Sequence, residues 1–403
     1  MTLLRLVVLF GVAVVMALDN GLARTPPMGW SSWNTFRCDI NEALILETAE
    51  KMISEGMRDA GYVYVNIDDC WSLHQRNASG YLVEDPAKFP HGIRYLADYL
   101  HKRGMKLGLY NAAGAWTCQG YPGSYHYEKQ DAELFASYDV DFWKQDWCAV
   151  ELGQDPRVSY PVLRDAVNAT GHPMVLSICE YGLKEVWTWG PTTGNMWRTT
   201  NDISDSWDRW TYILEAQAAI TGFSGPGGWN DMDMLVVGMG GQPDGHYQAH
   251  FSLWALLNSP LIAGNDVRKM TAATREILLN GEVIAVNQDP LGIQGTRIWQ
   301  SFLKEQEVWA RPLTGGMYAA VLLNRDEAKP RDVTLKLADL PPVPGTPAGQ
   351  VTAAMVRDLW AHADLGTFQG QYTAKVPARS AVMITLRPAC TRMCVRAPCE
   401  CDS

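Results

Sequence analysis

Acidic residues recur in this chain directly after short apolar stretches, and groups of carboxylates can carry acid/base chemistry or bind metal ions. Asp68 and Asp69 follow one such stretch, Asp146 ends another, and Asp202 comes four residues after Arg198. Metal-dependent sites usually add several histidines, but the chain has only 8 His, and none lies at the ends of these stretches. We therefore expect acid/base chemistry without a metal or other cofactor. A hard-cation site built from Asp alone is the alternative.

Two carboxylates that flank a glycosidic bond would suit this pattern. Cleavage passes through an oxocarbenium-like state, so one carboxylate must be ionised beneath the anomeric carbon while the other protonates the leaving oxygen. Tryptophan rings can pack on the apolar face of a sugar, although each one alone is more often part of a core. Five lie near the stretches in question: Trp33, Trp71, Trp147, Trp197 and Trp229.

The acids belong to a regular alternation of extended and helical segments. Short, continuously apolar strands that alternate with helices are typical of a parallel sheet covered on both faces. One helix is expected to begin at a capping box formed by Asp39 and Glu42, ahead of an apolar face that starts at Ile45. Eight such units predict a (β/α)₈ TIM barrel over residues 18–293, with the functional side chains at the carboxyl ends of its strands. The expected strands are 28–30, 62–67, 106–110, 141–145, 173–179, 195–198, 228–233 and 260–266.

The pattern changes after residue 293. The helical period disappears, and we expect short strands at 317–323, 333–337 and 381–386, separated by Pro, Gly and Asp. This pattern predicts a small C-terminal antiparallel β-sandwich domain over residues 294–388. The fold class is therefore α/β, a TIM barrel followed by a β-sandwich.

The termini and the cysteines indicate export. Residues 1–17 combine Arg5 with an unbroken apolar run and read as a signal peptide that is too short to span a bilayer. The sequons at Asn77 and Asn168 fit N-glycosylation on a secretory route. Nine Cys in an exported chain favour disulfides, and four of them crowd a tail at 389–403 whose purpose the sequence does not reveal. We expect a secreted or lysosomal protein.

Composition excludes two classes of partner. The chain has 34 Lys and Arg against 44 Asp and Glu, a formal charge of −10, and no run of basic residues. An acidic surface repels phosphate backbones, so nucleic-acid binding is not expected. No later segment is apolar enough for a membrane span.

Five motifs give the chain a specific resemblance. It resembles the α-galactosidases of glycoside hydrolase family 27, also called melibiases, densely from residue 18 to about 295 and loosely beyond. The motifs are LDNGLARTPPMGW (18–30), GYVYVNIDDCW (61–71), KQDWC (144–148), WRTTNDISDSW (197–207) and GGWNDMDML (227–235).

The resemblance implies a retaining hydrolase of terminal, non-reducing α-D-galactosyl residues. Asp146 matches the family's nucleophile and Asp202 its general acid/base. Lys144 matches a residue that binds the sugar hydroxyls, on the same side of the strand as Asp146. Asp68 and Asp69 match the pair that grips the far side of the galactose ring. Four further matches complete the pocket: Trp33, Tyr110, Arg198 and Asp231.

The resemblance also bears on specificity, through the segment Cys179 to Leu183. Glu180 is expected to bind the 2-hydroxyl, and together with Leu183 it would exclude an N-acetyl group. This favours galactose over the sister activity, α-N-acetylgalactosaminidase. Tyr181 stands where the family more often has Trp. A galactoside-binding relative without activity is the other alternative, but both catalytic carboxylates are present.

By the same resemblance, Cys38 pairs with Cys70 and Cys118 pairs with Cys148, which leaves Cys179 as a free thiol beside the pocket. A homodimer is expected by analogy with the family. The natural leaving group stays open, because glycolipids, oligosaccharides and galactomannans all present the same terminal sugar.

Overall fold

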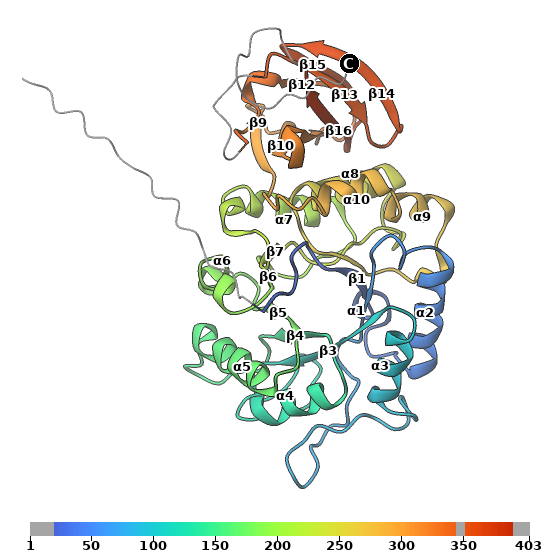
Figure 1. Cartoon of the computed structure of the whole chain (residues 1–403), viewed down its shortest axis with the longest axis vertical. Coiled ribbons are helices and arrows are strands. Elements are labelled where there is room, and N and C mark those ends of the chain that lie inside the picture. Colours follow the sequence, from blue (N-terminus) through green and yellow to red (C-terminus); the bar gives the residue numbers. More distant parts are fainter. Residues whose placement is uncertain (1–19, 344–350, 390–403) are drawn as a thin grey trace, which may run out of the picture.

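The computed structural model describes residues 20–343 and 351–389 as a helix-covered barrel with a β domain stacked on one side of it (Figure 1). The predicted signal peptide, 1–17, and all of the predicted tail beyond Ala389 lie outside the described residues. Within the described part, no helix has the length and apolar character that a membrane crossing requires.

Eight parallel strands form the barrel. Consecutive strands pair from β1 to β7, and β8 pairs with β1. A parallel bridge from Leu235, just after β7, to Ala263 in β8 closes the ring. The predicted TIM barrel is thus confirmed. Its strands are β1 Met28–Ser31, β2 Tyr64–Asn66, β3 Lys106–Ala112, β4 Phe142–Asp146, β5 Val175–Cys179, β6 Met196–Arg198, β7 Trp229–Asp231 and β8 Leu261–Ala263.

Helices cover the outside of the barrel (Figure 1). The longer ones are α2 Glu42–Ser54, α3 Ile93–His101, α4 Glu128–Ser137, α5 Pro156–Thr170, α7 Trp207–Gln217 and α8 Asp244–Leu256. The shorter ones are α1 Trp33–Phe36, α6 Val186–Trp189, α9 Ala272–Leu278 and α10 Gly281–Asn287. The 3₁₀ turns are η1 Leu183–Glu185, η2 Gly190–Thr192, η3 Thr221–Phe223, η4 Val267–Lys269, η5 Thr314–Gly316 and η6 Leu337–Asp339.

The predicted start of α2 is wrong by two residues. Asn41, not Asp39, is the N-cap, because its backbone is extended and its side chain accepts a hydrogen bond from the Leu44 N–H at 2.9 Å. The Glu42 carboxylate does not complete a capping box either, since it accepts from the His91 N–H at 3.0 Å instead.

The C-terminal domain consists of two antiparallel sheets. Six strands follow the order β14-β13-β16-β11-β10-β9, and β12 pairs with β15. The predicted β-sandwich is confirmed, although the sequence indicated only three of its strands. The strands are β9 Thr296–Gln300, β10 Gln306–Pro312, β11 Tyr318–Asn324, β12 Arg331–Lys336, β13 Ala353–Asp358, β14 Ala363–Gln369, β15 Gln371–Val376 and β16 Ser380–Pro388.

The central strands β10 and β11 of the six-stranded sheet are buried on both faces. In β10, Val308 and Ala310 point into the core shared with β12 and β15, whereas Trp309 points into the core shared with the barrel. On the barrel side, α8 packs directly on β11 and β16. One apolar core therefore runs from the barrel into the second domain.

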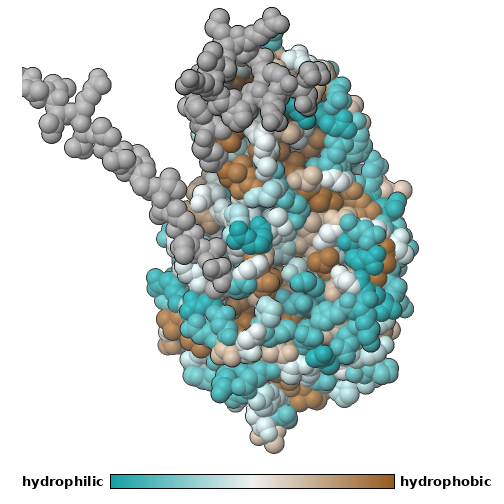
Figure 2. Space-filling model, viewed as in Figure 1, coloured by the Kyte–Doolittle hydropathy of each residue, from teal (hydrophilic) through white to brown (hydrophobic). Residues whose placement is uncertain are grey.

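The surface shown in Figure 2 is mainly polar, with apolar residues in smaller patches. This distribution is ordinary for a folded chain whose large apolar clusters are internal.

Candidate active site

The carboxyl ends of the barrel strands surround a cleft with a cavity volume of about 430 Å³. This lies within the range of small-molecule sites, roughly 300–1,000 Å³. The structure brings eight of the predicted site residues to this cleft: Trp33, Asp68, Tyr110, Lys144, Asp146, Tyr181, Arg198 and Asp202. It is also lined by the Cys118–Cys148 disulfide and by Asn34, Arg37, Gln119, Ile203, Asp233 and Met234.

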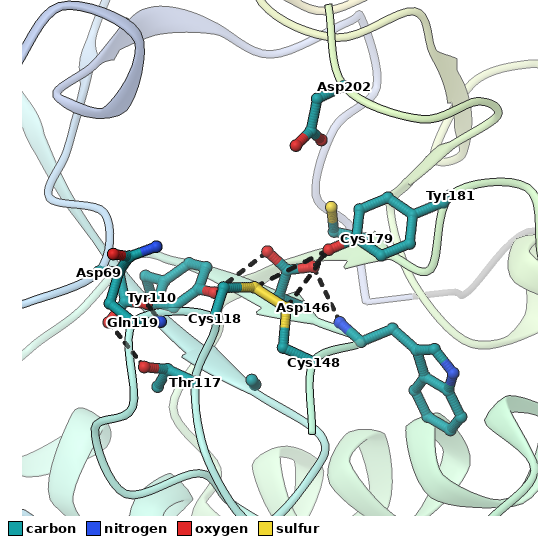
Figure 3. Close-up of a disulfide and its surroundings, with 12 residues drawn as sticks. Asp69, Tyr110, Thr117, Cys118, Gln119, Asp146, Cys148, Cys179, Tyr181 and Asp202 are labelled. Atoms are coloured by element: carbon teal, nitrogen blue, oxygen red, sulfur yellow. Dashed lines mark hydrogen bonds between the residues drawn. A yellow bond between two sulfur atoms is a disulfide. The ribbon is translucent and has the colours of Figure 1, made fainter. Parts of the chain in front are cut away.

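Asp146 ends β4 and is held by three donors (Figure 3). The Tyr181 hydroxyl donates to its Oδ1 at 2.5 Å, the Trp147 N–H to the same oxygen at 2.8 Å, and the Tyr110 hydroxyl to Oδ2 at 3.1 Å. These contacts fix the carboxylate in one orientation at the floor of the cleft, where it can meet a bound ligand without rearranging.

Lys144 lies two residues before Asp146 on the same face of β4. Its ammonium group donates to Asp68 Oδ2 at 2.8 Å. Burial lowers the pKa of Lys144, but the surrounding anions, Asp68 foremost, raise it more, so the lysine stays charged. Burial raises the pKa of Asp68 against the pull of Lys144. The pair presents one cation and one carboxyl to a polar ligand.

Asp69 does not line the cleft, unlike its neighbour. Its carboxylate accepts hydrogen bonds from the Thr117 hydroxyl at 2.9 Å and from the Gln119 N–H at 3.0 Å (Figure 3). Burial raises its pKa to about 6. In this structure Asp69 fastens the loop after β3 to the loop after β2, so it shapes the cleft from behind.

Asp202 lies in the loop after β6, with 68% of its side chain exposed. Arg198 donates to its Oδ1 at 3.0 Å, and the Arg209 Nε–H donates to its backbone carbonyl at 2.6 Å. Partial burial raises the pKa of Asp202, but the charges of Arg198, Lys144 and Arg209 outweigh it, so the pKa lies below its ordinary value. In Figure 3, the Asp202 side chain lies above that of Asp146, with an open space between the two carboxylates.

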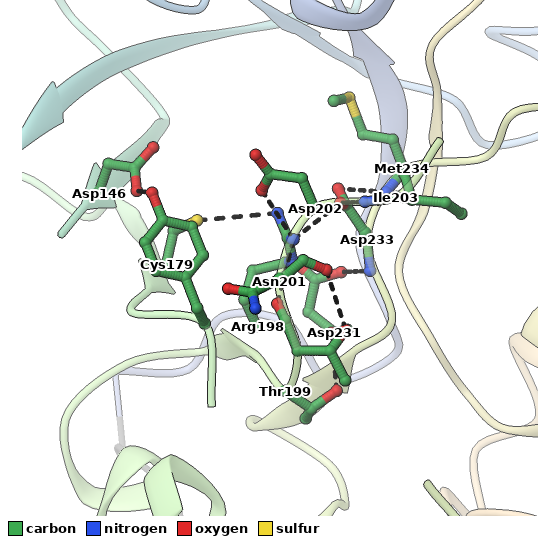
Figure 4. A network of polar contacts seen from close by, with 12 residues as sticks. Asp146, Cys179, Arg198, Thr199, Asn201, Asp202, Ile203, Asp231, Asp233 and Met234 are labelled. Atoms are coloured by element: carbon green, nitrogen blue, oxygen red, sulfur yellow. Dashed lines mark hydrogen bonds and ion pairs between the residues drawn. The ribbon is translucent and has the colours of Figure 1, made fainter. Parts of the chain in front are cut away.

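Asp233 is a site residue that the sequence analysis missed. Its carboxylate pairs with Arg198 at 2.8 Å and accepts from the Ile203 N–H at 2.7 Å, next to Asp202 (Figure 4). The predicted residue Asp231 lines a smaller inner cavity instead, and burial raises its pKa to about 6. The missed signal was the spacing, because Asp233 follows the predicted Asp231 by two residues and both line the inner cavity.

The segment after β5 differs from the prediction. The Glu180 side chain is fully buried and does not line the cleft, and both carboxyl oxygens are without hydrogen-bond partners within the described chain. Burial raises its pKa to about 9. Side chains alternate along β5, so Glu180 falls on the same face as Ile178, whose cluster includes Tyr160 and Trp197. The contact of Glu180 with a 2-hydroxyl stays a prediction, since this side chain lies outside the residues that line the cleft.

Leu183 is also outside the cleft, with 49% of the residue exposed. Within the segment from Glu180 to Leu183, Tyr181 alone lines the cleft, with its hydroxyl on Asp146. The role predicted for Glu180 and Leu183 in excluding an N-acetyl group stays a prediction, and neither residue lines the cleft in this structure.

Both predicted disulfides are present, Cys38–Cys70 and Cys118–Cys148. Cys179 is the free cysteine of the described chain, and it is buried with its Sγ 3.7 Å from an Arg198 nitrogen. It lies behind Asp146 and does not line the cleft.

A potential metal-binding group in the described residues consists of Cys118, Asp146 and Cys148. Both sulfur atoms are bonded to each other, so neither offers a thiolate ligand. What remains is a single carboxylate, which does not match any usual metal site.

Comparisons with known proteins agree on one family. Residues 25–289 match the family described as "Alpha galactosidase A", and residues 304–386 match the "Alpha galactosidase C-terminal beta sandwich domain". The chain is 48% identical to a "Probable alpha-galactosidase" of Dictyostelium discoideum, over 93% of this chain and 96% of that one. It is 47% identical to "Alpha-galactosidase 3" of Arabidopsis thaliana, over 93% of this chain and 84% of that one.

A solved structure gives the same result. The crystal structure of α-galactosidase I from Mortierella vinacea superposes with a TM-score of 0.87 at 36% identity, covering 91% of this chain and 98% of that one. Family profile, sequence relatives and structure all converge on the same barrel and β domain. The chain therefore belongs to the α-galactosidases of glycoside hydrolase family 27 and is a glycoside hydrolase.

Proposed function

We propose that the protein is a retaining α-galactosidase that hydrolyses terminal, non-reducing α-D-galactosyl residues, with Asp146 as nucleophile and Asp202 as general acid/base. The observation that carries this proposal is the placement of the two carboxylates in one cleft. Asp146 is fixed at the end of β4, and Asp202 lies across from it in the loop after β6 (Figures 3 and 4).

In the first step, an oxygen of Asp146 forms a bond to the anomeric carbon while the bond from that carbon to the leaving oxygen breaks. Asp202 transfers its proton to the leaving oxygen, which departs as an alcohol. The Tyr110 and Tyr181 hydroxyls point at the attacking carboxylate and keep it aimed at that carbon.

In the second step, Asp202, now ionised, takes a proton from water as the water oxygen attacks the anomeric carbon. The bond to Asp146 breaks, and two inversions return galactose with the α configuration. Arg198 supports the ionised form of Asp202 in this step, since it donates to the carboxylate. A bound substrate displaces water from Asp202, which raises its pKa and favours the protonated form needed in the first step.

The names of two relatives support galactose as the substrate sugar. The proteins from Dictyostelium discoideum and Arabidopsis thaliana described above are both named as α-galactosidases. The buried side of the cleft offers Lys144 and Asp68 to the sugar hydroxyls. Tyr181 is the residue from the β5 segment best placed to limit the substituent at carbon 2.

The test is to follow hydrolysis of nitrophenyl α-galactoside by proton NMR and to compare it with nitrophenyl α-N-acetylgalactosaminide. We expect α-galactose as the first product and a strong preference for the first substrate. Release of β-galactose would contradict retention, and preference for the acetamido substrate would assign the sister activity. No turnover of either would indicate a binding protein. Activity should persist in EDTA, because the mechanism uses no metal.

We further propose that the protein enters the secretory route and is secreted or lysosomal, as the predicted signal peptide suggests. Asn77 and Asn168 are both exposed, which supports their glycosylation. A shift in electrophoretic mobility after N-glycosidase treatment of the protein from eukaryotic cells would test this. A homodimer stays a proposal, to be tested by light scattering.

A further inference from the structure

The loop after β6 must hold Asp202 mainly through its backbone. Within the described chain, the Asp202 side chain makes one hydrogen bond, with Arg198, and 68% of it is exposed. A general acid has to come within hydrogen-bond reach of the leaving oxygen, roughly 2.6–3.2 Å. An exposed side chain with a single partner keeps that position only where the main chain that carries it is fixed.

The backbone beside Asp202 is held from two directions. The Arg209 Nε–H, from α7, donates to the Asp202 carbonyl at 2.6 Å. The Ile203 N–H donates to Asp233 in the loop after β7 at 2.7 Å (Figure 4). Past Ile203 the chain still has to reach α7, and a further anchor acts on this stretch.

Asp205 ties the same loop to α8 and to the segment before it. Its Oδ2 accepts from the Gly241 N–H at 2.6 Å and from the Tyr247 hydroxyl at 2.8 Å, and its Oδ1 accepts from Gln242 Nε2–H at 2.8 Å. Tyr247 is buried in α8, and its hydroxyl in turn accepts from the Gly240 N–H at 2.8 Å. Hydrogen bonds to an ionised carboxylate are about twice as strong as neutral ones, so this anchor is a firm one.

The surroundings of Asp205 fit this contact closely. A Cβ on Gly241 would lie 2.6 Å from Asp205 Oδ2 and 2.8 Å from its carbonyl oxygen, so the approach needs glycine. Burial first, and then the bond to Asp205, raises the pKa of Tyr247 to about 12, so the hydroxyl keeps its proton and donates it. Gln242 also accepts from the Trp210 Nε1–H at 3.1 Å, which links the anchor to α7.

We propose that Asp205 is a positioning residue for the acid/base step, because it fixes the main chain that carries Asp202. Asp205 does not line the cleft, so its effect on the reaction passes through the position of Asp202. This role rests on the proposed function of Asp202 as general acid/base.

The test compares two galactosides that differ in their need for a proton. The methanol of methyl α-galactoside leaves only with a proton from the acid, whereas α-galactosyl fluoride releases an anion. In Asp205→Ala, we expect kcat/KM for the methyl galactoside to fall about 10- to 100-fold, as misplacements near 1 Å do, while kcat/KM for the fluoride changes little. Asp205→Asn keeps one acceptor oxygen and should lose less.

Azide gives a second measurement that a merely structural role would not move. Azide is already an anion, so it bonds to the anomeric carbon without a base, while the bond from that carbon to Asp146 breaks and its electron pair returns to the carboxylate. Azide should raise kcat of Asp205→Ala on the fluoride, with α-galactosyl azide as product. The wild type should not respond.

A matched control is Asp326→Ala. Asp326 also accepts three hydrogen bonds, from the Ala328 N–H, the Lys329 N–H and Arg331, but it lies between β11 and β12 in the second domain. Its loss should lower stability and leave the ratio of the two kcat/KM values unchanged.

Equal losses on both substrates, an unchanged ratio, or no response to azide would overturn the role of Asp205. If Asp205→Ala fails to fold, Tyr247→Phe decides, because it removes one donor and keeps the ring; it should lower the same ratio by a smaller factor. Failure of the proposed function looks different: the wild type would hydrolyse neither substrate, or Asp202→Asn itself would leave the ratio unchanged.

Discussion

At the residue scale, Asp202 and Asp233 share Arg198 as an ion-pair partner but differ in exposure. Asp202 is partly exposed beside Arg198, which keeps its pKa low, whereas Asp233 neutralises the same arginine from the buried side. The charge of Arg198 is thus shared between a structural partner and the proposed acid/base. The balance between these two pairs should set the pH at which Asp202 gives up its proton.

Replacing Asp233 by Asn tests this balance. Without the buried anion, Arg198 acts more strongly on Asp202 and lowers its pKa further, so the protonated acid is lost at lower pH. We expect the alkaline limb of the kcat/KM profile to move to lower pH by about one unit. Asp244→Asn, at an exposed aspartate that begins α8, is the control. A limb that stays in place or moves to higher pH would contradict this role.

Glu180 should make the protein less stable as the pH rises. Its pKa is about 9 in the folded protein and near its ordinary value of 4.5 in the unfolded chain. Its contribution to the free energy of unfolding is therefore fully present below about pH 4.5. This contribution declines as the pH rises toward 9, because over that range only the unfolded chain releases the proton.

Glu180→Gln replaces the titrating carboxyl group with an amide that does not titrate. Its free energy of unfolding should exceed that of the wild type by a margin that grows from pH 5 to pH 8, by up to about 1.4 kcal/mol per pH unit. Urea unfolding at several pH values measures the margin. Glu276→Gln, at an exposed position in α9, should show no such growth. A constant margin for Glu180→Gln would mean that the carboxyl is already ionised in the folded protein.

At the element scale, the barrel could be predicted because each strand is a short apolar run that ends in polar residues. All eight predicted strands overlap those of the structure. Five strands of the β domain were missed, since polar or charged residues interrupt or flank their short apolar stretches. In β10, the buried Glu307 is compensated by Arg325 at 3.0 Å, which no local pattern reveals. In β14, most residues are exposed, Leu365 among them, so no alternation of buried apolar and exposed polar residues marks the strand.

Among the residues predicted for the site, more than half line the cleft and could be found from the sequence, mainly through the family motifs. Eight of the thirteen residues expected in the pocket line the cleft, while their roles stay predictions. Sequence could not show that Glu180 lies outside the cleft, because one residue decides which face of a strand a side chain takes, and the end of β5 cannot be located that closely from sequence. Arg37 was missed because an exposed, isolated arginine has no distinctive pattern.

The segment after β5 has an unusual backbone conformation, and it requires glycine at position 182. Tyr181, Gly182, Lys184 and Glu185 all have positive φ. A Cβ on Gly182 would lie 2.2 Å from the carbonyl oxygen of Thr199, in the loop that carries Asp202. Only glycine fits at this position, and the close approach that it allows places the Tyr181 hydroxyl within hydrogen-bonding distance of Asp146.

Gly182→Ala should therefore displace Tyr181 and lower kcat/KM about 10- to 100-fold, as misplacements near 1 Å do. Gly153→Ala is a matched control, because Gly153 also has positive φ (89°) but has no atom within 4 Å of the added Cβ. Its cost should be confined to backbone strain, measured as a small loss of thermal stability. Full activity of Gly182→Ala would show that the segment does not position Tyr181.

At the scale of the whole molecule, the two domains are expected to unfold together. The apolar core is continuous through α8 and the six-stranded sheet. Polar contacts cross the same boundary, including Trp360 Nε1–H to the Ser252 hydroxyl at 2.9 Å and Asn280 Nδ2–H to the Leu359 carbonyl at 2.9 Å. The β domain covers apolar helix surface that the barrel alone would expose to water.

Calorimetry should therefore show a single unfolding transition for the full chain, with equal calorimetric and van't Hoff enthalpies. Cutting the chain after residue 293 should yield an aggregating barrel, since α8 loses its cover. Two separate transitions, or a soluble and active barrel fragment, would show that the domains are energetically independent.

The central claim is that Asp146 forms the covalent bond to galactose. It is tested most directly by incubating the protein with a fluorinated galactosyl fluoride that forms the intermediate quickly and hydrolyses slowly, followed by peptide mass spectrometry. We predict one equivalent of fluorogalactosyl label, attached to Asp146. Label on another residue, or turnover of the natural sugar with no trapped adduct at all, would contradict the account.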